Sequence, residues 1–206
     1  RRVRLLCLHG ARASSDVTRL QMEVLGLAAA DDVELHYLDA PFECETSYDS
    51  SATLGRSWQR YDQHPPGTAA ARAELRASLE LVYERVRDDG PYDGAFGFSQ
   101  GAAIVAILSD PSVWREMGGD KPPWRFVVLA GGVDHLVREL SNLHVESGLP
   151  SLHLLGDADE FLAESEALKA RFSRPHAVRH PYAHSLPLQL ASSHPDLVEA
   201  VLAFVR

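Results

Sequence analysis

The sequence predicts an α/β fold, with a mainly parallel sheet of about six strands and helices on both faces. Two observations support this prediction. The expected strands are short, continuous apolar runs, which is typical of strands covered on both faces. They alternate with segments of helical periodicity, and such alternation builds parallel sheets through right-handed crossovers. The 206 residues, 45% of them hydrophobic, supply enough apolar material for one core, so we expect a single domain over residues 1–206.

Six segments have the composition of buried strands. They are Val3–Leu8, Val33–Leu38, Tyr92–Phe98, Trp124–Ala130, Leu149–Leu155 and Ala177–His180. Helices are expected between these strands and after the last one. They are Ser14–Ala30, Thr68–Arg87, Ala102–Leu108, a short segment from Asp110 to Gly118, Val133–His144, Phe161–Phe172 and Pro195–Val205. The second helix is the clearest, because its apolar residues recur on one face at helical spacing: Leu75, Leu79, Val82 and Val86.

A G-x-S-x-G pattern, formed by Gly97, Ser99 and Gly101, lies between an expected strand and an expected helix. In a nucleophile elbow the serine stands on such a sharp turn, and the crowded backbone requires glycine on both sides. The following helix directs its N–H groups and positive dipole end towards the serine, where an oxyanion would develop. The alternative is a glycine-rich turn before a core helix. The apolar runs on both sides of the pattern favour the elbow.

A serine hydroxyl becomes a nucleophile when a histidine takes its proton and a carboxylate orients that histidine. In α/β-hydrolases the acid follows the serine in the chain, and the histidine comes last. Asp157 and Asp159 both follow an expected strand, at the edge of the sheet where catalytic groups gather. Either carboxylate fits the acid. The alternative role for each is to cap the helix that begins near Phe161.

Four histidines lie downstream of these carboxylates: His176, His180, His184 and His194. His184 is the best-placed base, because it lies in a loop beyond the last core strand. We expect His180 to end that strand and His194 to precede or cap the final helix. The spacing of the first three also suits a metal site on a helix, but Pro175 and Pro181 argue against a helix there. No H-E-x-x-H or C-x-x-C motif accompanies them, so we expect neither a metal nor another cofactor.

The oxyanion hole of such a serine needs two N–H donors. We expect the first from the backbone of Gln100, which follows the serine, and the second from Ala11, in the loop after the first strand. Gly10 would let this loop approach closely. His9 is expected to be a structural hydrogen-bonding residue.

The segment Asp39–Gly67 has no clear periodicity and is long for a loop in a compact domain, which is typical of functional loops. We expect it to cover the serine and to shape the acyl pocket, because an acyl-enzyme must be shielded from water. The side chains expected to bind substrate are Phe42, Tyr48, Trp58 and Leu186. Tyr61 is a further large aromatic in the loop. The alternative for each aromatic is to anchor the loop to the core.

The composition excludes several classes of partner. A formal net charge of −9 argues against nucleic acid or an anionic membrane, because phosphate binding needs clustered Lys and Arg. Two cysteines, Cys7 and Cys44, do not make a disulfide framework. No stretch approaches the ~20 apolar residues that cross a bilayer. We therefore expect a cytoplasmic protein that binds neither nucleic acid nor an anionic membrane, and the oligomeric state stays open.

The chain resembles the FSH family of serine hydrolases, which are small α/β-hydrolases without a separate lid domain. The segments that carry the resemblance are Leu5–Gly10, Asp39–Phe42, Gly90–Ala103, Phe126–Gly132 and His153–Leu168. The resemblance implies an esterase or thioesterase that acts through a Ser-Asp-His triad and an acyl-enzyme. The family's G-x-x-D element matches Gly156–Asp159, which implies Asp159 as the acid, beside Ser99 and His184.

The chain departs from the family pattern at two places. Tyr182 and Ala183 stand before His184 where the family has two glycines, and Phe161-Leu162 follows the acid where the family has an apolar residue and proline. These differences bear on the shape of the loops and hence on substrate fit. The alternatives for function are a lactone hydrolase or an acyltransferase on the same fold, and a degenerate hydrolase that acts as a binding module.

Overall fold

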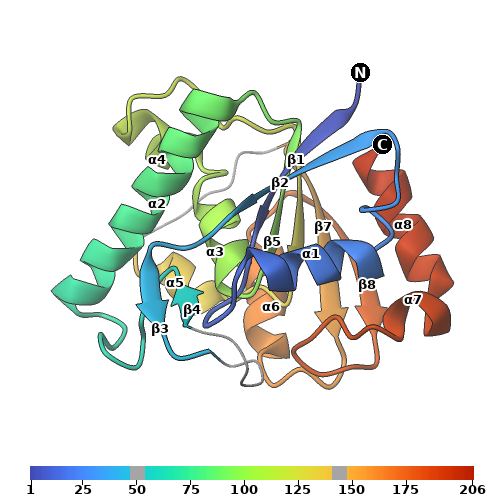
Figure 1. Cartoon of the computed structure of the whole chain (residues 1–206). Helices are drawn as coiled ribbons and strands as arrows, with labels where there is room; N and C mark the ends of the chain where they lie inside the picture. The colour runs from blue at the N-terminus through green and yellow to red at the C-terminus, as the bar shows by residue number, and fades with distance from the viewer. Residues whose placement is uncertain (47–53, 141–147) are drawn as a thin grey trace.

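The computed structural model describes residues 1–46, 54–140 and 148–206. At its centre lies a sheet of six parallel strands in the order β2-β1-β5-β6-β7-β8 (Figure 1). These strands are β1 (Val3–Leu8), β2 (Val33–Leu38), β5 (Gly94–Phe98), β6 (Phe126–Ala130), β7 (Pro150–Gly156) and β8 (Arg174–His180). The predicted parallel sheet is therefore confirmed. A second, antiparallel sheet pairs two short strands, β3 (Phe42–Cys44) and β4 (Gly55–Ser57).

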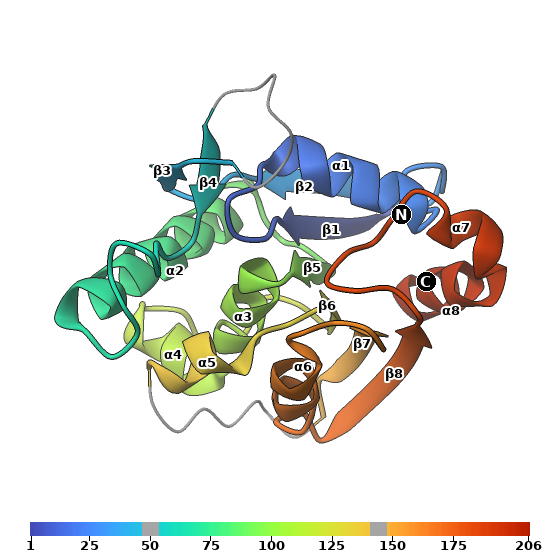
Figure 2. The ribbon, with the colours of Figure 1, turned by 90° about the horizontal axis from the view of Figure 1, so that it is seen from below.

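Helices cover both faces of the large sheet (Figure 2). One face carries α1 (Ser15–Val24), α7 (Leu190–Ser193) and α8 (Pro195–Val205). The other carries α2 (Ala69–Asp89), α3 (Gln100–Ile107), α4 (Pro111–Glu116), α5 (Asp134–Arg138) and α6 (Leu162–Lys169). A hydrophobic core lies on each face of the sheet, and successive side chains of β1 point into the two cores in turn. Leu6 and Leu8 join the core with α2 and α3, whereas Leu5 and Cys7 join the core with α1 and α8.

Several predicted boundaries differ from the observed ones by two residues or more, and two of these differences have clear physical reasons. Helix α1 ends at Val24 rather than at Ala30, because the chain turns at Gly26, which has a φ of 71°. Strand β8 begins at Arg174, three residues before the predicted start, and most of it is exposed. As an edge strand it tolerates polar side chains and Pro175, so it lacks the apolar run of an inner strand.

Three further elements differ from the prediction because they are short. The β3-β4 hairpin lies within the segment predicted to be a loop, and three-residue strands give no readable alternation. Helix α7 has four residues, too few for a helical period. Helix α5 ends at Arg138, whereas the predicted helix continues to His144, and residues 141–147 lie outside the described ranges.

The parallel arrangement brings the ends of five strands to one edge of the sheet. The segments that follow β1, β5, β6, β7 and β8 hold, in chain order, Ala11, Ser99, Gly131, Asp159 and His184. Residues that are far apart in the sequence thereby become neighbours.

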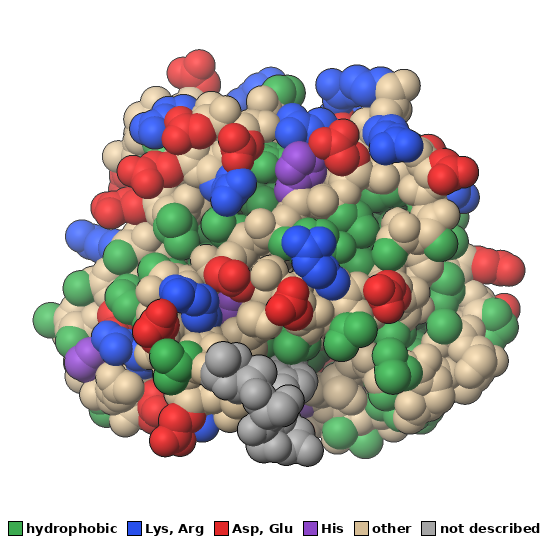
Figure 3. All heavy atoms as spheres, in the orientation of Figure 1, with side chains coloured by type: hydrophobic (Ala, Val, Ile, Leu, Met, Phe, Trp, Pro, Cys, Tyr) green, Lys and Arg blue, Asp and Glu red, His purple; other side chains and the backbone are tan. Residues whose placement is uncertain are grey.

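On the face drawn in Figure 3, acidic and basic side chains are intermingled, and no extended basic patch is visible there. Among the helices of the described residues, none is both long and apolar enough to cross a membrane.

Candidate active site

Ser99 lies on the turn between β5 and α3, with φ 53° and ψ −115°, a conformation that residues other than glycine rarely adopt. Gly97 and Gly101 permit the turn. A Cβ at Gly97 would lie 2.5 Å from the backbone of α3, and one at Gly101 would lie 2.5 Å from carbonyl oxygens at the end of β1. The Ser99 N–H donates to the carbonyl of Ala130 at 2.9 Å, which fixes the turn to β6.

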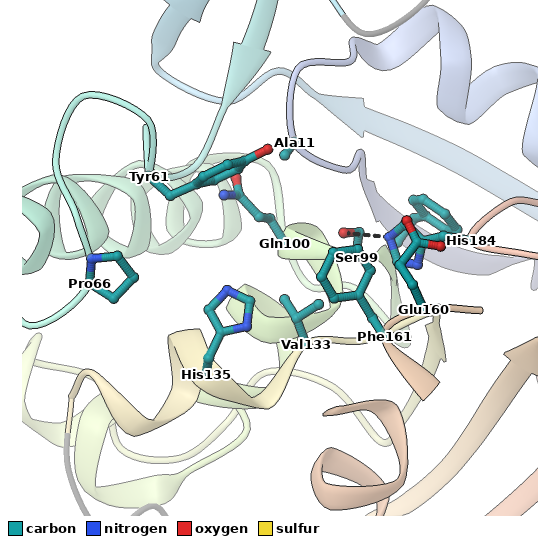
Figure 4. A pocket seen from close by; sticks show the side chains of 11 residues that line it. Ala11, Tyr61, Pro66, Ser99, Gln100, Val133, His135, Glu160, Phe161 and His184 are labelled. Atoms are coloured by element: carbon teal, nitrogen blue, oxygen red, sulfur yellow. Dashed lines mark hydrogen bonds between the residues drawn. The ribbon is translucent and has the colours of Figure 1, made fainter. Parts of the chain in front are cut away.

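A series of hydrogen bonds joins three side chains at this turn. Ser99 Oγ lies 2.9 Å from His184 Nε2 (Figure 4), and His184 Nδ1 lies 2.8 Å from Asp159 Oδ2. The other oxygen of Asp159 accepts the N–H of Phe161 at 2.7 Å, so both carboxylate oxygens are engaged. The Asp159 side chain is 2% exposed. With Nδ1–H donating to the carboxylate, the neutral imidazole presents the lone pair of Nε2 to the serine hydroxyl.

The other acid and base candidates have separate partners. Asp157 forms an exposed ion pair with Arg179, with 2.6 Å between Oδ1 and Nε. His180 is buried at the end of β8, where desolvation lowers its pKa. His194 precedes α8, and its Nδ1 lies 2.8 Å from Ser193 Oγ. Within the described ranges, no group of three or more His, Cys, Asp or Glu side chains is arranged to hold a metal ion.

The loop after β1 passes close to the serine. A Cβ at Gly10 would lie 2.9 Å from the Phe98 ring and 3.3 Å from the Cβ of Ser99, so glycine is needed for this approach. The loop is held by His9, which is wholly buried: its Nε2 accepts the N–H of Ala40 at 2.9 Å, and its Nδ1 donates to the carbonyl of Gly10 at 2.6 Å. Burial lowers the pKa of His9, which keeps the ring neutral.

A cavity of about 540 Å³ opens beside the serine (Figure 4). Its lining residues are Ala11, Tyr61, Pro66, Phe98, Ser99, Gln100, Val133, His135, Glu160, Phe161 and His184. Tyr61 and Pro66 belong to the predicted active-site loop, so part of that loop does form the wall. Both residues expected to supply oxyanion-hole N–H groups, Ala11 and Gln100, are on the wall beside Ser99.

Three of the four side chains expected to bind substrate lie outside the cavity lining. Trp58 is wholly buried in the core, where its Nε1–H donates to the carbonyl of His9 at 2.7 Å, so it anchors the loop. Leu186 packs into the core with α7 and α8. Phe42 lies on β3, outside the cavity lining, with the Arg60 guanidinium 5.0 Å from its ring centre. Tyr48 lies outside the described residues.

The model of one protein family, described as serine hydrolase (FSH1), matches residues 1–195. The chain belongs to this family. The FSH1-family match covers the serine, the carboxylate and the histidine of the hydrogen-bonded series, and the resemblance predicted from the motifs is confirmed.

Relatives of this FSH1-family chain include hydrolases and esterases. An uncharacterized hydrolase of Schizosaccharomyces pombe, C22A12.06c, is 26% identical over 215 residues, which cover 93% of this chain and 49% of that protein. The chain thus spans about half of that relative's length. Esterase AAEL000016 of Aedes aegypti is 32% identical over 210 residues, covering 96% of this chain and 74% of the esterase. The crystal structure of esterase PE8 matches with a TM-score of 0.64 at 18% identity, over 100% of this chain and 92% of that one. This likeness confirms the α/β-hydrolase fold.

Several residues shape this FSH1-family site through contacts that the sequence alone does not predict. Gly131, with a φ of 52°, lies directly against His184. Gly156 lies beneath the loop that carries His184: a Cβ there would fall 2.4 Å from the carbonyl oxygen of Tyr182. Phe161 packs against the His184 ring, with 4.9 Å between centroids. The two glycines could have been found from their position in the sequence. Gly131 follows β6 and Gly156 ends β7, and the carboxyl ends of both strands lie near the serine.

The side chain of Gln100 is a further missed contact. Its Oε1 accepts the N–H groups of Trp58 and Gln59 at 3.0 and 3.3 Å, and its Nε2–H donates to the Gln59 carbonyl at 2.8 Å. The residue that follows the serine is therefore bonded to the segment that leads to Tyr61. Sequence reasoning had assigned Gln100 only a backbone role.

Proposed function

We propose that this FSH1-family chain hydrolyses acyl esters or thioesters through an acyl-enzyme on Ser99. The observation that carries the proposal is the series Ser99–His184–Asp159, with contacts of 2.9 and 2.8 Å, on the wall of a cavity of about 540 Å³. The family match and the relatives named esterases support it. A cavity of this size suits a small-molecule substrate.

In the first half-reaction, His184 Nε2 takes the proton of Ser99 as Oγ attacks the acyl carbonyl carbon. Asp159 holds Nδ1–H and stabilises the imidazolium that forms. The negative charge on the carbonyl oxygen is stabilised by the N–H groups of Gln100 and Ala11, since both residues lie on the wall beside Ser99. When the tetrahedral intermediate collapses, His184 returns the proton to the departing alcohol or thiol, and the acyl group remains on Oγ.

In the second half-reaction, water replaces the leaving group. His184 takes a proton from the water as its oxygen attacks the acyl carbon, and the same N–H groups stabilise the second oxyanion. Collapse breaks the bond to Ser99 Oγ, which regains its proton from His184, and a carboxylic acid is released. Phe161 and Tyr61 limit the access of bulk water to this intermediate, because both rings line the cavity.

Labelling with a fluorophosphonate, followed by assays with p-nitrophenyl esters and acyl-CoAs of graded length, tests the proposal. The wild type should be labelled once, at Ser99, and should hydrolyse some of these substrates. Ser99→Ala should retain its fold but show neither labelling nor hydrolysis. Ser193→Ala is the matched control, because Ser193 also contacts a histidine, His194, and its loss should change nothing.

Two outcomes would contradict the proposal. Stoichiometric labelling at another serine would show that the elbow serine is not the nucleophile. A protein that shows neither labelling at Ser99 nor hydrolysis of any ester or thioester would instead be a degenerate hydrolase that acts as a binding module.

A further inference from the structure

The cavity beside Ser99 carries one imidazole that the proposed reaction does not use. His135, on α5, lines the same cavity as Ser99 and His184. Figure 4 shows the two imidazoles on different sides of this space, with Ser99 next to His184. The neighbours of His135 on the wall include apolar groups such as Val133 and Pro66. A small number of polar groups on a mainly apolar wall is the usual means by which a pocket orients its ligand.

His135 is fixed in place by Glu164 of α6. Its backbone N–H donates to Glu164 Oε2 at 2.6 Å, and its Nδ1 lies 3.5 Å from the same oxygen. Glu164 Oε1 in turn accepts from Arg138 at 2.9 Å. These contacts orient the ring through its Nδ1 side. Among the residues that the structure describes, no side chain or backbone group is hydrogen-bonded to Nε2, so this nitrogen is available to a ligand in the cavity.

The charges near the cavity decide which polar group fits. Glu160 lines the cavity, and Glu164 lies behind His135. Glu164 is paired with Arg138, but Glu160 opposes a further negative charge in the cavity, so an acyl chain that ends in a carboxylate is disfavoured. A hydroxyl group carries no charge. It can donate to Nε2 of a neutral imidazole or accept from Nε2–H of an imidazolium, and it therefore fits His135 in either protonation state.

In the proposed reaction His184 protonates the leaving group, which therefore lies on the His184 side of Ser99, whereas His135 lies on a different side of the cavity. We propose that His135 forms a polar subsite for the acyl chain and that the preferred substrates are esters or thioesters of hydroxylated acyl chains. This inference rests on the proposed hydrolase function and names the class of acyl group that the site selects. His135 acts as a specificity-determining residue, whereas Ser99, His184 and Asp159 carry the chemistry. An unsubstituted chain would lie against Nε2 without replacing its hydrogen bond to water.

A hydroxyl scan tests the subsite. The substrates are p-nitrophenyl esters of one acyl length, unsubstituted, with a hydroxyl at each successive carbon, or with a terminal carboxylate. For the wild type, kcat/KM should peak at one hydroxyl position, roughly tenfold above the unsubstituted ester, as expected for one hydrogen bond. The carboxylate ester should be the slowest. His135→Phe should lose the peak, so that its kcat/KM for the hydroxylated ester no longer exceeds its own kcat/KM for the unsubstituted ester.

Two further variants separate recognition from general damage. His135→Gln retains a hydrogen-bonding group and should keep part of the peak. His176→Phe removes an exposed imidazole on β8, outside the cavity lining, and should keep the full peak. The rate of fluorophosphonate labelling at Ser99 reports whether the hydrogen-bonded series is intact in each variant.

The outcomes distinguish the subsite from the hydrolase function itself. A flat profile for a wild type that hydrolyses the unsubstituted ester overturns the subsite. The same peak in His135→Phe, at the same position, also overturns it. If no ester in the series is hydrolysed and Ser99 is not labelled, the proposed hydrolase function has failed instead.

Discussion

The imidazole of His184 lies directly against the backbone of Gly131. A Cβ at Gly131 would fall 3.0 Å from Cε1 of the ring, 3.1 Å from Nδ1 and 3.5 Å from Oδ2 of Asp159. Gly131 follows β6, the strand next to the one that ends at the serine. The position of the His184 ring relative to Ser99 thus depends on the absence of a Cβ at Gly131, although Gly131 takes no part in the proposed chemistry.

Gly131→Ala should therefore reduce turnover by moving the His184 ring. A displacement of about 1 Å costs on the order of 100-fold in rate, and we expect a loss of that size in kcat with a p-nitrophenyl ester. Gly118→Ala is the matched control, because Gly118 also has a positive φ, 93°, but a Cβ there would meet only the Tyr83 hydroxyl at 3.5 Å. Both variants should lose about 1 kcal/mol of unfolding free energy to backbone strain. Wild-type kcat in Gly131→Ala would contradict the prediction.

The two carboxylates after β7 should differ sharply in their effect on activity. Asp159→Asn presents an amide to His184 Nδ1 and stabilises the wrong tautomer, so kcat should fall by roughly 10⁴-fold. Asp157→Asn removes an exposed ion pair with Arg179 and should change stability by less than about 1 kcal/mol and kcat very little. Steady-state kinetics of the two purified variants gives the comparison. The opposite ranking would assign the acid to Asp157.

Substitutions at Tyr61 and at Trp58 should have different effects: the first should change substrate preference and the second should lower stability. Tyr61 lines the cavity and is 45% exposed, so Tyr61→Ala should shift the preferred acyl length while the melting temperature changes little. Trp58→Phe removes the buried donor to the His9 carbonyl and leaves a void, at a cost of about 1–3 kcal/mol, without a change in preference. Activity profiles over graded acyl esters and thermal melts test both. Unchanged length preference in Tyr61→Ala would show that other wall residues set it.

His153 should make the fold sensitive to acid. Burial on β7 lowers its pKa to about 3, whereas the pKa of the unfolded chain is the ordinary 6.5. Below pH 6.5 the unfolded state binds a proton that the folded state does not, so stability is complete above that pH and is lost as the pH falls towards 3. The loss at pH 5, relative to pH 7, should be about 2 kcal/mol.

Urea unfolding of wild type and His153→Leu at both pH values measures this loss. The variant should lose less stability than wild type on acidification. Without His153, the unfolded chain no longer gains a proton that the folded chain cannot bind at this position. His176→Leu, which removes an exposed imidazole, should retain the wild-type difference. Equal differences in wild type and His153→Leu would assign the acid sensitivity to other groups.

The inner strands and the serine turn were readable from the sequence because they rest on local chemistry. Strands buried on both faces must be apolar throughout, as in Phe126–Ala130, and a sharp turn between packed elements must have glycine where backbones touch, as at Gly97 and Gly101. The exposed β8 gave a weaker signal, since an edge strand needs no apolar run.

The cavity wall was less readable, because it depends on which way each side chain faces. Trp58 and Tyr61 are three residues apart in the chain, and both are large aromatic residues. Nevertheless, Trp58 is buried in the core and Tyr61 lines the cavity. His135 lies in a helix with no motif, and its position on the wall follows from the packing of α5 against α6. Tertiary contacts of this kind leave no periodic trace in the sequence.

The hydrogen bonds of Gln100 have a consequence for how such a hydrolase diverges. Because this side chain holds the backbone of Trp58 and Gln59, the start of one wall segment is attached to α3, the helix that follows Ser99. Changes that displace the backbone of residues 58 and 59 would therefore disturb the turn that carries Ser99. Tyr61 and His135 take no part in this attachment. Under the proposed function, a laboratory library or a gene duplicate can therefore vary these two positions and change the accepted acyl group while Ser99 keeps its geometry.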